Sequence, residues 1–272
     1  MITRRQLLAV AIISGLSLVG VGCKSTPASN SIANRPIIEP KAQIDTREAN
    51  KPQGEPIKPS GSQLAPSEPK VEAPILENKP VHSLRVLPVP FTPQAPYADW
   101  NLPYQEACEE ASMVMAAEYF KGNKTLQLDP AYANQEILKL VEWQKINRGF
   151  YEDTTASEVA SILKDYYNLT AEVVAYNPEV IKQALTNNKL VLIPAAGRLL
   201  GNPYFHRPGP LYHMLVVKGY EGDEFITNDP GTKRGESFRY QESALRRAAH
   251  DWNSGDVEHG EQVMIVVSKS QE

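Results

Sequence analysis

The chain has 272 residues, of which 42% are hydrophobic and 22% are charged, and its net charge is −4. This composition is typical of a globular protein, and the length suits one large domain or two small ones. The sequence has no Lys- or Arg-rich run, which argues against a nucleic-acid partner. It also has no His-Glu-x-x-His or paired Cys-x-x-Cys spacing and no phosphate-binding glycine loop, so no metal or nucleotide cofactor is indicated.

Residues 1–22 have the layout of a secretory signal peptide, with Arg4-Arg5 followed by an apolar run and then small residues. The segment Leu18-Val19-Gly20-Val21-Gly22-Cys23 resembles a bacterial lipoprotein processing site, although Gly20 stands where that motif prefers leucine. We therefore expect Cys23 to be lipidated, and the protein to be an exported lipoprotein anchored at the periplasmic or extracytoplasmic face of the bacterial cell envelope. The choice between inner and outer membrane, and between general and twin-arginine export, stays open.

Residues 23–85 are predicted to form a disordered tether behind the lipidated cysteine. Residues 24–84 hold ten of the 22 prolines and no Phe, Trp or Tyr. Such a segment cannot bury enough apolar surface to offset the entropy lost on ordering. A proline-rich ligand for a binding module is the alternative, and it requires a partner that the sequence does not identify. The folded domain is expected to span 86–272.

The elements of this domain are predicted in chain order from hydrophobic periodicity and capping signals. An extended edge segment is expected over 87–94, and helices over 104–120, 130–144, 156–167, 178–187 and 241–249. Strands are expected over 171–175, 190–194, 214–220, 224–228 and 262–268. Helices that precede an antiparallel sheet indicate the α+β class.

Cys108 lies in the first turn of the helix predicted over 104–120, where the positive end of the helix dipole favours a thiolate. The helical face that carries it consists mostly of small residues, which allows close packing. If Cys23 is lipidated, Cys108 has no disulfide partner. A buried structural cysteine is the alternative interpretation.

A thiol nucleophile requires an imidazole base, which in turn requires a carboxylate or amide to orient it. His213 stands at the start of a predicted strand and is therefore held more rigidly than His206, which lies in a loop. Asp229 follows the next strand, so a hairpin of the two strands would bring His213 and Asp229 to the same edge. Each residue alone also fits a structural role, as a buried histidine and as a turn aspartate.

Four segments in this order resemble the papain-fold cysteine peptidases of the C-39-like group, which are relatives of the bacteriocin-leader (double-glycine) peptidases. The segments are Val89–Gln94, Glu106–Ser112, Tyr212–Tyr220 and Asn228–Thr232. The resemblance covers about 86–268 and implies a papain-like α+β fold in which the nucleophile helix packs on a C-terminal antiparallel sheet.

The resemblance also implies a role for each of four residues. Cys108 would be the nucleophile, His213 the general base and later the acid, and Asp229 the group that orients the imidazole. Gln94 would donate its amide to the oxyanion hole beside the backbone N–H of Cys108. Gln105 is a rival for that role because it lies nearer to the cysteine in sequence.

The sequence departs from the resemblance beside the nucleophile, where many relatives have glycine and this chain has Glu109 followed by Glu110. Two acids at this point oppose thiolate formation unless they point away on a solvated face.

From the order of Gln94, Cys108, His213 and Asp229, we expect a thiol hydrolase that cleaves amide bonds of a peptide or protein. The alternatives are a scaffold domain without activity, or a hydrolase or acyltransferase that acts on peptidoglycan peptides. The irregular loop 198–210 is the predicted substrate-selecting wall or lid.

Overall fold

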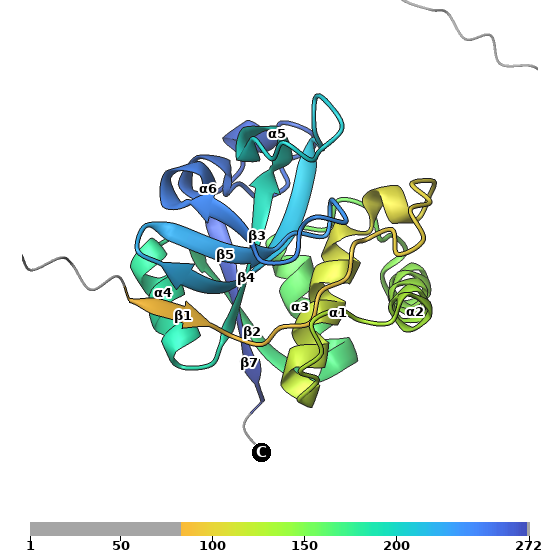
Figure 1. The fold of residues 1–272 in the computed structure, drawn as a ribbon. Coiled ribbons are helices and arrows are strands. Elements are labelled where there is room, and N and C mark those ends of the chain that lie inside the picture. The colour runs from red at the N-terminus through yellow and green to blue at the C-terminus, as the bar shows by residue number, and fades with distance from the viewer. Residues whose placement is uncertain (1–82, 271–272) are drawn as a thin grey trace, which may run out of the picture. The chain divides into compact units, whose positions relative to one another are not determined.

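The computed structural model describes residues 83–270, and its centre is a seven-stranded antiparallel sheet (Figure 1). The strand order is β2-β7-β3-β4-β5-β6, and β1 pairs with β4. The strands are β1 (Leu84–Val86), β2 (Leu169–Ala175), β3 (Leu190–Ala196), β4 (Tyr212–Glu221), β5 (Glu224–Asn228), β6 (Phe238–Gln241) and β7 (Val263–Lys269). The predicted signal peptide, Cys23 and all but the last three residues of the predicted tether lie outside the described residues.

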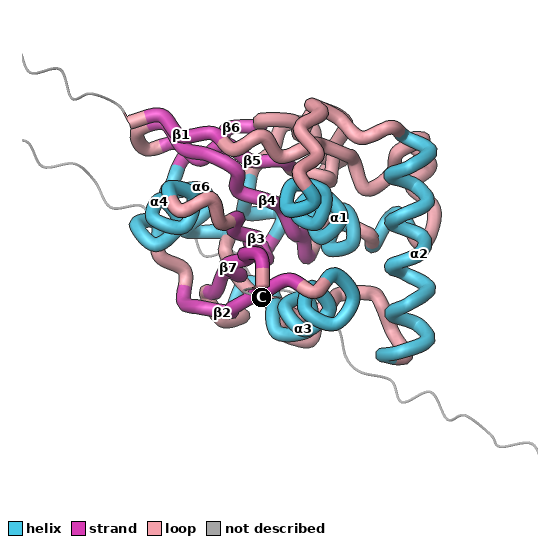
Figure 2. The backbone as a smooth tube through the Cα atoms, turned by 90° about the horizontal axis from the view of Figure 1, so that it is seen from below, coloured by secondary structure: helices cyan, strands magenta, loops and turns pink. Residues whose placement is uncertain are grey.

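Helices cover both faces of the sheet. They are α1 (Cys108–Lys121), α2 (Pro130–Arg148), α3 (Ala156–Tyr167), α4 (Pro178–Thr186), α5 (Gly197–Leu200) and α6 (Glu242–Ala248), with short 3-10 turns η1 (Tyr104–Glu106) and η2 (Val257–His259). Helices α1 and α3 lie on one face, and α4 and α6 lie on the other (Figures 1 and 2). Helix α2 packs outside α1, so α1 is enclosed between the sheet and a second helix.

Local signals in the sequence account for several of these boundaries. Thr155 and Glu158 form the predicted capping box of α3, and the side chain of Asn177 caps α4. Strand β3 is buried along its whole length, as its continuous apolar run indicates. The α+β prediction, with the cysteine-bearing helix packed on the antiparallel sheet, is confirmed.

Two predicted elements differ in detail. Residues 104–106 form a 3-10 turn, and the α-helix begins at Cys108. The face of small residues that carries Cys108 is packed, and so are the others, because both the sheet and α2 cover the helix and nearly every residue up to Phe120 is buried. The segment 87–94 is not a sheet edge. It runs through the interior, where Phe91 bonds to the backbone of Leu126 and Leu128.

The structure contains elements that the pattern did not predict. Strand β1 begins at Leu84, within the predicted tether, and β6 pairs with β5 at the far edge of the sheet. The predicted loop 198–210 starts inside the short helix α5 and is irregular from Gly201 onward. Within residues 83–270, no helix combines the length and apolar character needed to cross a bilayer.

Candidate active site

The β4–β5 hairpin brings His213 and Asp229 together, as the sequence predicts. Val216 of β4 pairs with Asn228, the last residue of β5, so Asp229 emerges beside the start of β4. The Nε2 atom of His213 lies 2.8 Å from Oδ1 of Asp229, and both side chains are at most 1% exposed. Because an ionised carboxylate only accepts hydrogen bonds, Nε2 carries the donated proton, and in the neutral imidazole Nδ1 then has the lone pair.

Asp229 is held by more donors than the sequence revealed. The Tyr240 hydroxyl and the Asn202 amide donate to Oδ2 at 2.6 and 3.0 Å, and the Gly231 N–H donates to Oδ1 at 3.0 Å. Burial by itself would raise the pKa of Asp229, but the electrostatic interaction with His213 and the hydrogen bonds that the carboxylate accepts outweigh burial and hold the pKa below its usual range. The carboxylate is therefore fixed in its ionised, accepting form.

The imidazole is also fixed by packing. The Phe205 ring meets the His213 ring edge-on, with 5.3 Å between centroids. A Cβ atom added to Gly231 would lie 2.9 Å from Cε1 of His213 and 2.8 Å from Cε1 of Phe205. Glycine at position 231 is thus required for the loop after β5 to approach the ring this closely.

Cys108 is the first residue of α1 and is 6% exposed. Its Sγ donates a hydrogen bond to Oε2 of Glu109 at 2.9 Å, and no hydrogen bond joins Sγ to His213 in the described part of the chain. Burial raises the pKa of the thiol, and the Glu109 carboxylate raises that pKa further. The thiolate that the helix dipole would favour is therefore opposed in this arrangement, and Glu109 opposes it as the sequence indicated.

The two acids after the cysteine do not point to solvent, so the solvated-face alternative is wrong. Glu109 is 1% exposed and its Oε1 accepts the Thr154 N–H at 3.1 Å. Burial raises the pKa of Glu109 to about 7. Glu110 lies on the α2 side, where it accepts a hydrogen bond from Gln144, and burial raises its pKa as well. Glu109 therefore belongs to the site, whereas Glu110 belongs to the helix packing.

Gln94 lies in the same cleft but its amide nitrogen is already engaged. Nε2 donates to the carbonyl oxygens of Tyr104 and Gln105 at 2.8 and 3.0 Å, which fastens η1 just ahead of Cys108. The side chain is 4% exposed, and its Oε1 atom has no hydrogen-bond partner among the described residues. Gln105, the rival candidate, also lines the cleft but is exposed, and its amide donates to Glu106.

These residues surround a cleft of about 430 Å³ between the start of α1 and the loops at the β4 edge. The cleft is lined by Gln94, Trp100, Gln105, Glu106, Cys108, Glu109, Asp153, Phe205, His206, Pro210, Leu211, Tyr212, His213, Gly231 and Trp252. It thus holds the predicted nucleophile, base and amide together, and Asp229 lies directly behind the imidazole.

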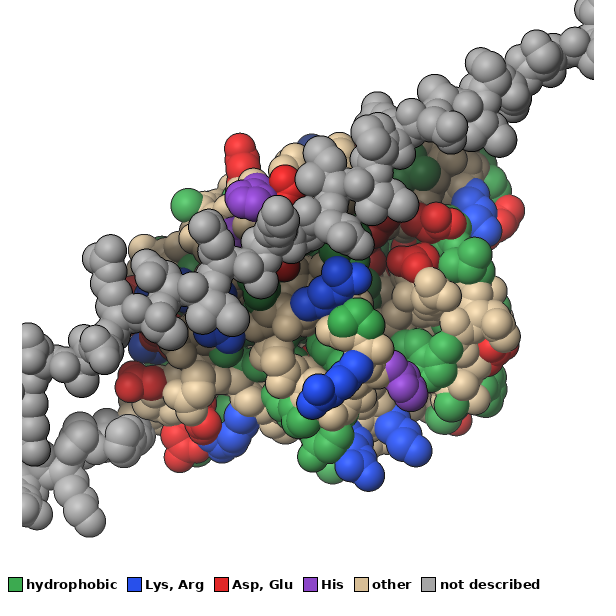
Figure 3. All heavy atoms as spheres, turned by 90° about the horizontal axis from the view of Figure 1, so that it is seen from above, with side chains coloured by type: hydrophobic (Ala, Val, Ile, Leu, Met, Phe, Trp, Pro, Cys, Tyr) green, Lys and Arg blue, Asp and Glu red, His purple; other side chains and the backbone are tan. Residues whose placement is uncertain are grey.

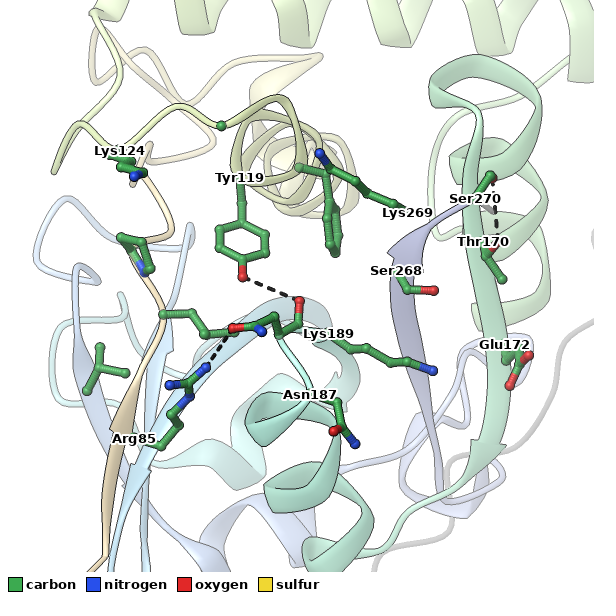
Figure 4. A pocket seen from close by; sticks show the side chains of 16 residues that line it. Arg85, Tyr119, Lys124, Thr170, Glu172, Asn187, Lys189, Ser268, Lys269 and Ser270 are labelled. Carbon is green, nitrogen blue, oxygen red and sulfur yellow. Dashed lines mark hydrogen bonds between the residues drawn. The ribbon is translucent and has the colours of Figure 1, made fainter. Parts of the chain in front are cut away.

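A larger hollow of about 1080 Å³ lies between β1, the end of α1 and β7 (Figure 4). Four cations line it, namely Arg85, Lys124, Lys189 and Lys269, and Glu172 is the one acid among its lining residues. This hollow contains none of the predicted site residues. The smaller cleft is the candidate active site because it holds the thiol and the imidazole.

Several site residues could not be identified in the sequence. Tyr240 lies on the unpredicted strand β6, and Asn202 lies in an irregular loop far from Asp229 in the chain. Trp100 and Trp252 line the cleft from loops without a recognisable motif. Glu109 was noticeable only as a departure from the pattern around Cys108.

A buried thiol at a helix start, in one cleft with an imidazole that a carboxylate orients, is the arrangement of the cysteine-peptidase class. The chain belongs to the Peptidase_C39 like family, whose model matches residues 86–255. Membership in this family suggests a cysteine peptidase.

Two solved structures are similar to this chain. One is a C39-like peptidase from Bacillus anthracis, with 16% identity and a TM-score of 0.47, covering 70% of this chain and 100% of that one. The other is the peptidase domain of Streptococcus ComA, a bi-functional ABC transporter involved in a quorum-sensing pathway, with 16% identity and a TM-score of 0.35, covering 61% of this chain and 93% of that one. A search of curated proteins found no sequence match.

Proposed function

We propose that the domain is a thiol hydrolase that cleaves peptide or other amide bonds through an acyl-enzyme on Cys108. The observation that carries this proposal is the buried His213–Asp229 hydrogen bond of 2.8 Å behind the cleft that Cys108 lines. Use of Nε2 for Asp229 leaves the lone pair of Nδ1 to accept a proton, which is the property required of a general base.

The proposed reaction follows from these roles. The Cys108 proton passes to Nδ1 of His213 as sulfur attacks the carbonyl carbon of the substrate. The C–N bond then breaks, and the imidazolium gives its proton to the leaving amine. Water then gives a proton to His213 as its oxygen attacks the thioester carbon. The C–S bond breaks to release the carboxylic acid, and the imidazolium returns its proton to the Cys108 thiolate. Asp229 stabilises the imidazolium that forms in each half of the cycle.

The developing oxyanion requires N–H donors. The backbone N–H of Cys108 is available at the first position of α1, where helix N–H groups have no intrahelical partner. Gln94 can contribute only if its Nε2 turns one N–H away from the carbonyls of η1 that it now contacts. A Gln94→Ala variant should lower kcat by roughly 10²-fold if the amide serves the oxyanion. A loss of thermal stability with kcat unchanged would assign it to fastening η1.

Activity on peptide amides and labelling by a thiol-reactive amide mimic should both disappear in Cys108→Ala. In His213→Ala, labelling should slow and hydrolysis should fall to background, while circular dichroism checks that each variant remains folded. Hydrolysis that survives in Cys108→Ala would refute the proposal. An unreactive wild-type thiol would instead favour the second candidate.

The second candidate function is a binding or scaffold domain on the same fold. The hydrogen bond from Cys108 to Glu109 favours it, because a carboxylate at 2.9 Å opposes formation of the nucleophilic thiolate. This candidate predicts thiol alkylation with an apparent pKa at or above the ordinary cysteine value of roughly 8.5. The hydrolase requires an apparent pKa well below 7 once substrate or an analogue is bound.

We also propose that the domain, over residues 86–272, is held at the bacterial envelope by a lipid on Cys23. The lipoprotein-like motif at 18–23 supports this proposal. The substrate would then be an envelope peptide or protein, with peptidoglycan peptides as one class. Incorporation of labelled fatty acid should occur in the full chain and be lost in Cys23→Ala. Equal labelling of both chains would exclude the anchor.

A further inference from the structure

One wall of the candidate active-site cleft is acidic. Glu106, Glu109 and Asp153 line it, and no lysine or arginine is among the residues that line this cleft. The basic side chains that line it are the imidazoles of His206 and His213. Three carboxyl groups that share a cavity of about 430 Å³ repel one another unless a cation enters.

The structure supplies no cation to these acids. Within residues 83–270, none of Glu106, Glu109 and Asp153 forms a salt bridge with lysine or arginine. Burial raises the pKa of Asp153, and the charges of Glu106 and Glu152 raise it further. The carboxylates therefore lie close enough to affect one another while their charge is left uncompensated.

A second, independent feature points to a ligand that donates hydrogen bonds. Gln94 lines the same cleft and is 4% exposed, yet its Oε1 atom accepts no hydrogen bond within the described residues. Exchanging the amide oxygen and nitrogen would not help, because the nitrogen is needed by the carbonyls of Tyr104 and Gln105. A buried acceptor without a donor is costly, so a shift of this side chain that lets a ligand N–H reach Oε1 would be favoured.

Aromatic side chains frame the acidic wall. Trp100 and Trp252 both line the cleft, and each presents an indole ring, the side chain that attracts cations most strongly through its face. A methylene chain can pack on such rings while its charged end reaches the carboxylates.

The charge changes sign across the cleft mouth. Phe205 also lines a neighbouring hollow of about 510 Å³, whose lining includes Arg198 and Arg207 and no acid. On the face seen from above, several acidic side chains lie close together to the right of centre and several basic side chains lie below them, while both kinds also occur elsewhere on the face (Figure 3). A cation is therefore attracted to the side of the cleft formed by η1 and residue 153, and repelled from the α5 side.

We propose that this cleft selects substrates with an ammonium group close to the scissile amide, bound between Glu106 and Asp153. The proposal rests on the proposed hydrolase function and names its substrate class. The ammonium group can be a lysine-type side chain or a free α-amino group, since both present the same charge and donors.

Binding tests the proposal without requiring catalysis. In Cys108→Ala, the fluorescence of Trp100 and Trp252 is titrated with Nα-acetyl-lysine methylamide and with its neutral counterpart Nα-acetyl-norleucine methylamide. Alanine methylamide, with and without an acetyl group, tests the α-amino source. At low salt, at least one ammonium compound should bind at least fivefold tighter than its neutral partner, and the ratio should shrink as salt is added.

Matched variants assign the preference to the cleft. In the Cys108→Ala background, Glu106→Gln with Asp153→Asn should reduce the binding ratio to within about twofold. The control pair, Glu142→Gln with Glu172→Gln, removes the same charge from residues that do not line this cleft and should leave the ratio unchanged. Equal loss in both pairs would mean that net charge attracts the cation, which overturns the proposal.

The outcomes separate this proposal from the function on which it rests. Equal binding of the ammonium and neutral compounds overturns the substrate class even if the wild type hydrolyses peptides. A preference for the ammonium compounds that depends on Glu106 and Asp153 supports it, even if the wild type proves inactive. In that case the hydrolase proposal fails and an amine-binding cleft is left.

Discussion

Replacement of Glu109 by glutamine should make Cys108 more reactive. Oε2 of Glu109 accepts a hydrogen bond from the Cys108 thiol, with 2.9 Å between Sγ and Oε2, and both side chains are buried. At that separation and an effective dielectric constant near 20, a thiolate and an ionised carboxylate repel each other by about 6 kcal/mol. This is an upper figure, because burial raises the pKa of Glu109 to about 7, so the carboxyl group can take up a proton instead.

Glutamine keeps the shape of the side chain and removes the charge, and its amide can donate to the sulfur. We therefore expect the alkylation rate of Glu109→Gln at pH 7 to rise at least tenfold, equivalent to about 1.4 kcal/mol in favour of the thiolate. The assay measures the rate of modification by iodoacetamide between pH 5 and 9, using mass spectrometry. A Cys23→Ser background limits the reaction to Cys108, the other cysteine of the chain.

Glu110→Gln is the matched control, because Glu110 is equally buried but accepts its hydrogen bond from Gln144. Its effect on the alkylation rate should be several times smaller than that of Glu109→Gln. An unchanged or slower rate in a folded Glu109→Gln protein would refute the electrostatic argument. It would mean that burial alone holds the proton on the thiol, or that Glu109 assists its removal.

Three further outcomes follow from the same contacts. Burial raises the pKa of Glu109 to about 7, so the folded protein binds a proton there that the unfolded chain releases. The free energy of unfolding should therefore fall by at most about 3 kcal/mol as pH rises from 4.5 through 7. Denaturant titrations at several pH values should find a smaller fall in Glu109→Gln. Tyr240→Phe removes the hydroxyl that donates a 2.6 Å hydrogen bond to Asp229, so the pKa of Asp229 should rise. The acid limb of the pH profile of kcat should then move to higher pH, and kcat should fall roughly tenfold. Gly231→Ala places a methyl group 2.9 Å from the His213 ring and should displace the imidazole, which lowers kcat more than it raises KM. Unchanged steady-state kinetics would mean that the ring has room to move.

The sequence was sufficient for the parts of the site that depend on local pattern. An apolar strand, a turn and a second strand predict a hairpin, and the hairpin places His213 beside Asp229. Helix starts at Thr155 and Asn177 were equally accessible, because a cap is a contact between residues three or fewer positions apart. In each case the determining contact is short-range or follows from strand pairing.

The rest depended on contacts between residues distant in sequence. Nothing beside Tyr240 or Asn202 indicates that they meet at Asp229, since strand β6 has only four residues and Asn202 lies in a loop. The place of Glu109 stayed open for the same reason, since the sequence allowed either a solvated face or an acid that weakens the thiolate. The position of a glutamate on an isolated helix predicts solvent, but here α2 and the sheet cover the helix from both sides.

The loop after α5 shows how such contacts change the interpretation of a segment. From sequence, replacement of 201–208 by a short linker is expected to alter substrate preference more than stability. Asn202 bonds to Asp229, and Phe205 packs on His213, so the loop also supports the proposed base. Its replacement should therefore lower kcat for every substrate, in addition to any change of preference.

Glu109 connects the state of the thiol to the proposed substrate. A cation in the cleft would lie near both Glu109 and Cys108, since all three occupy one cavity. Its charge would favour the ionised form of each group and oppose their mutual repulsion. The thiol that burial and Glu109 hold protonated in the empty cleft would thus ionise more readily with an ammonium group bound. On this argument the nucleophile forms when a cationic substrate is in place, and Nα-acetyl-lysine methylamide should accelerate alkylation of Cys108 while its norleucine counterpart should not.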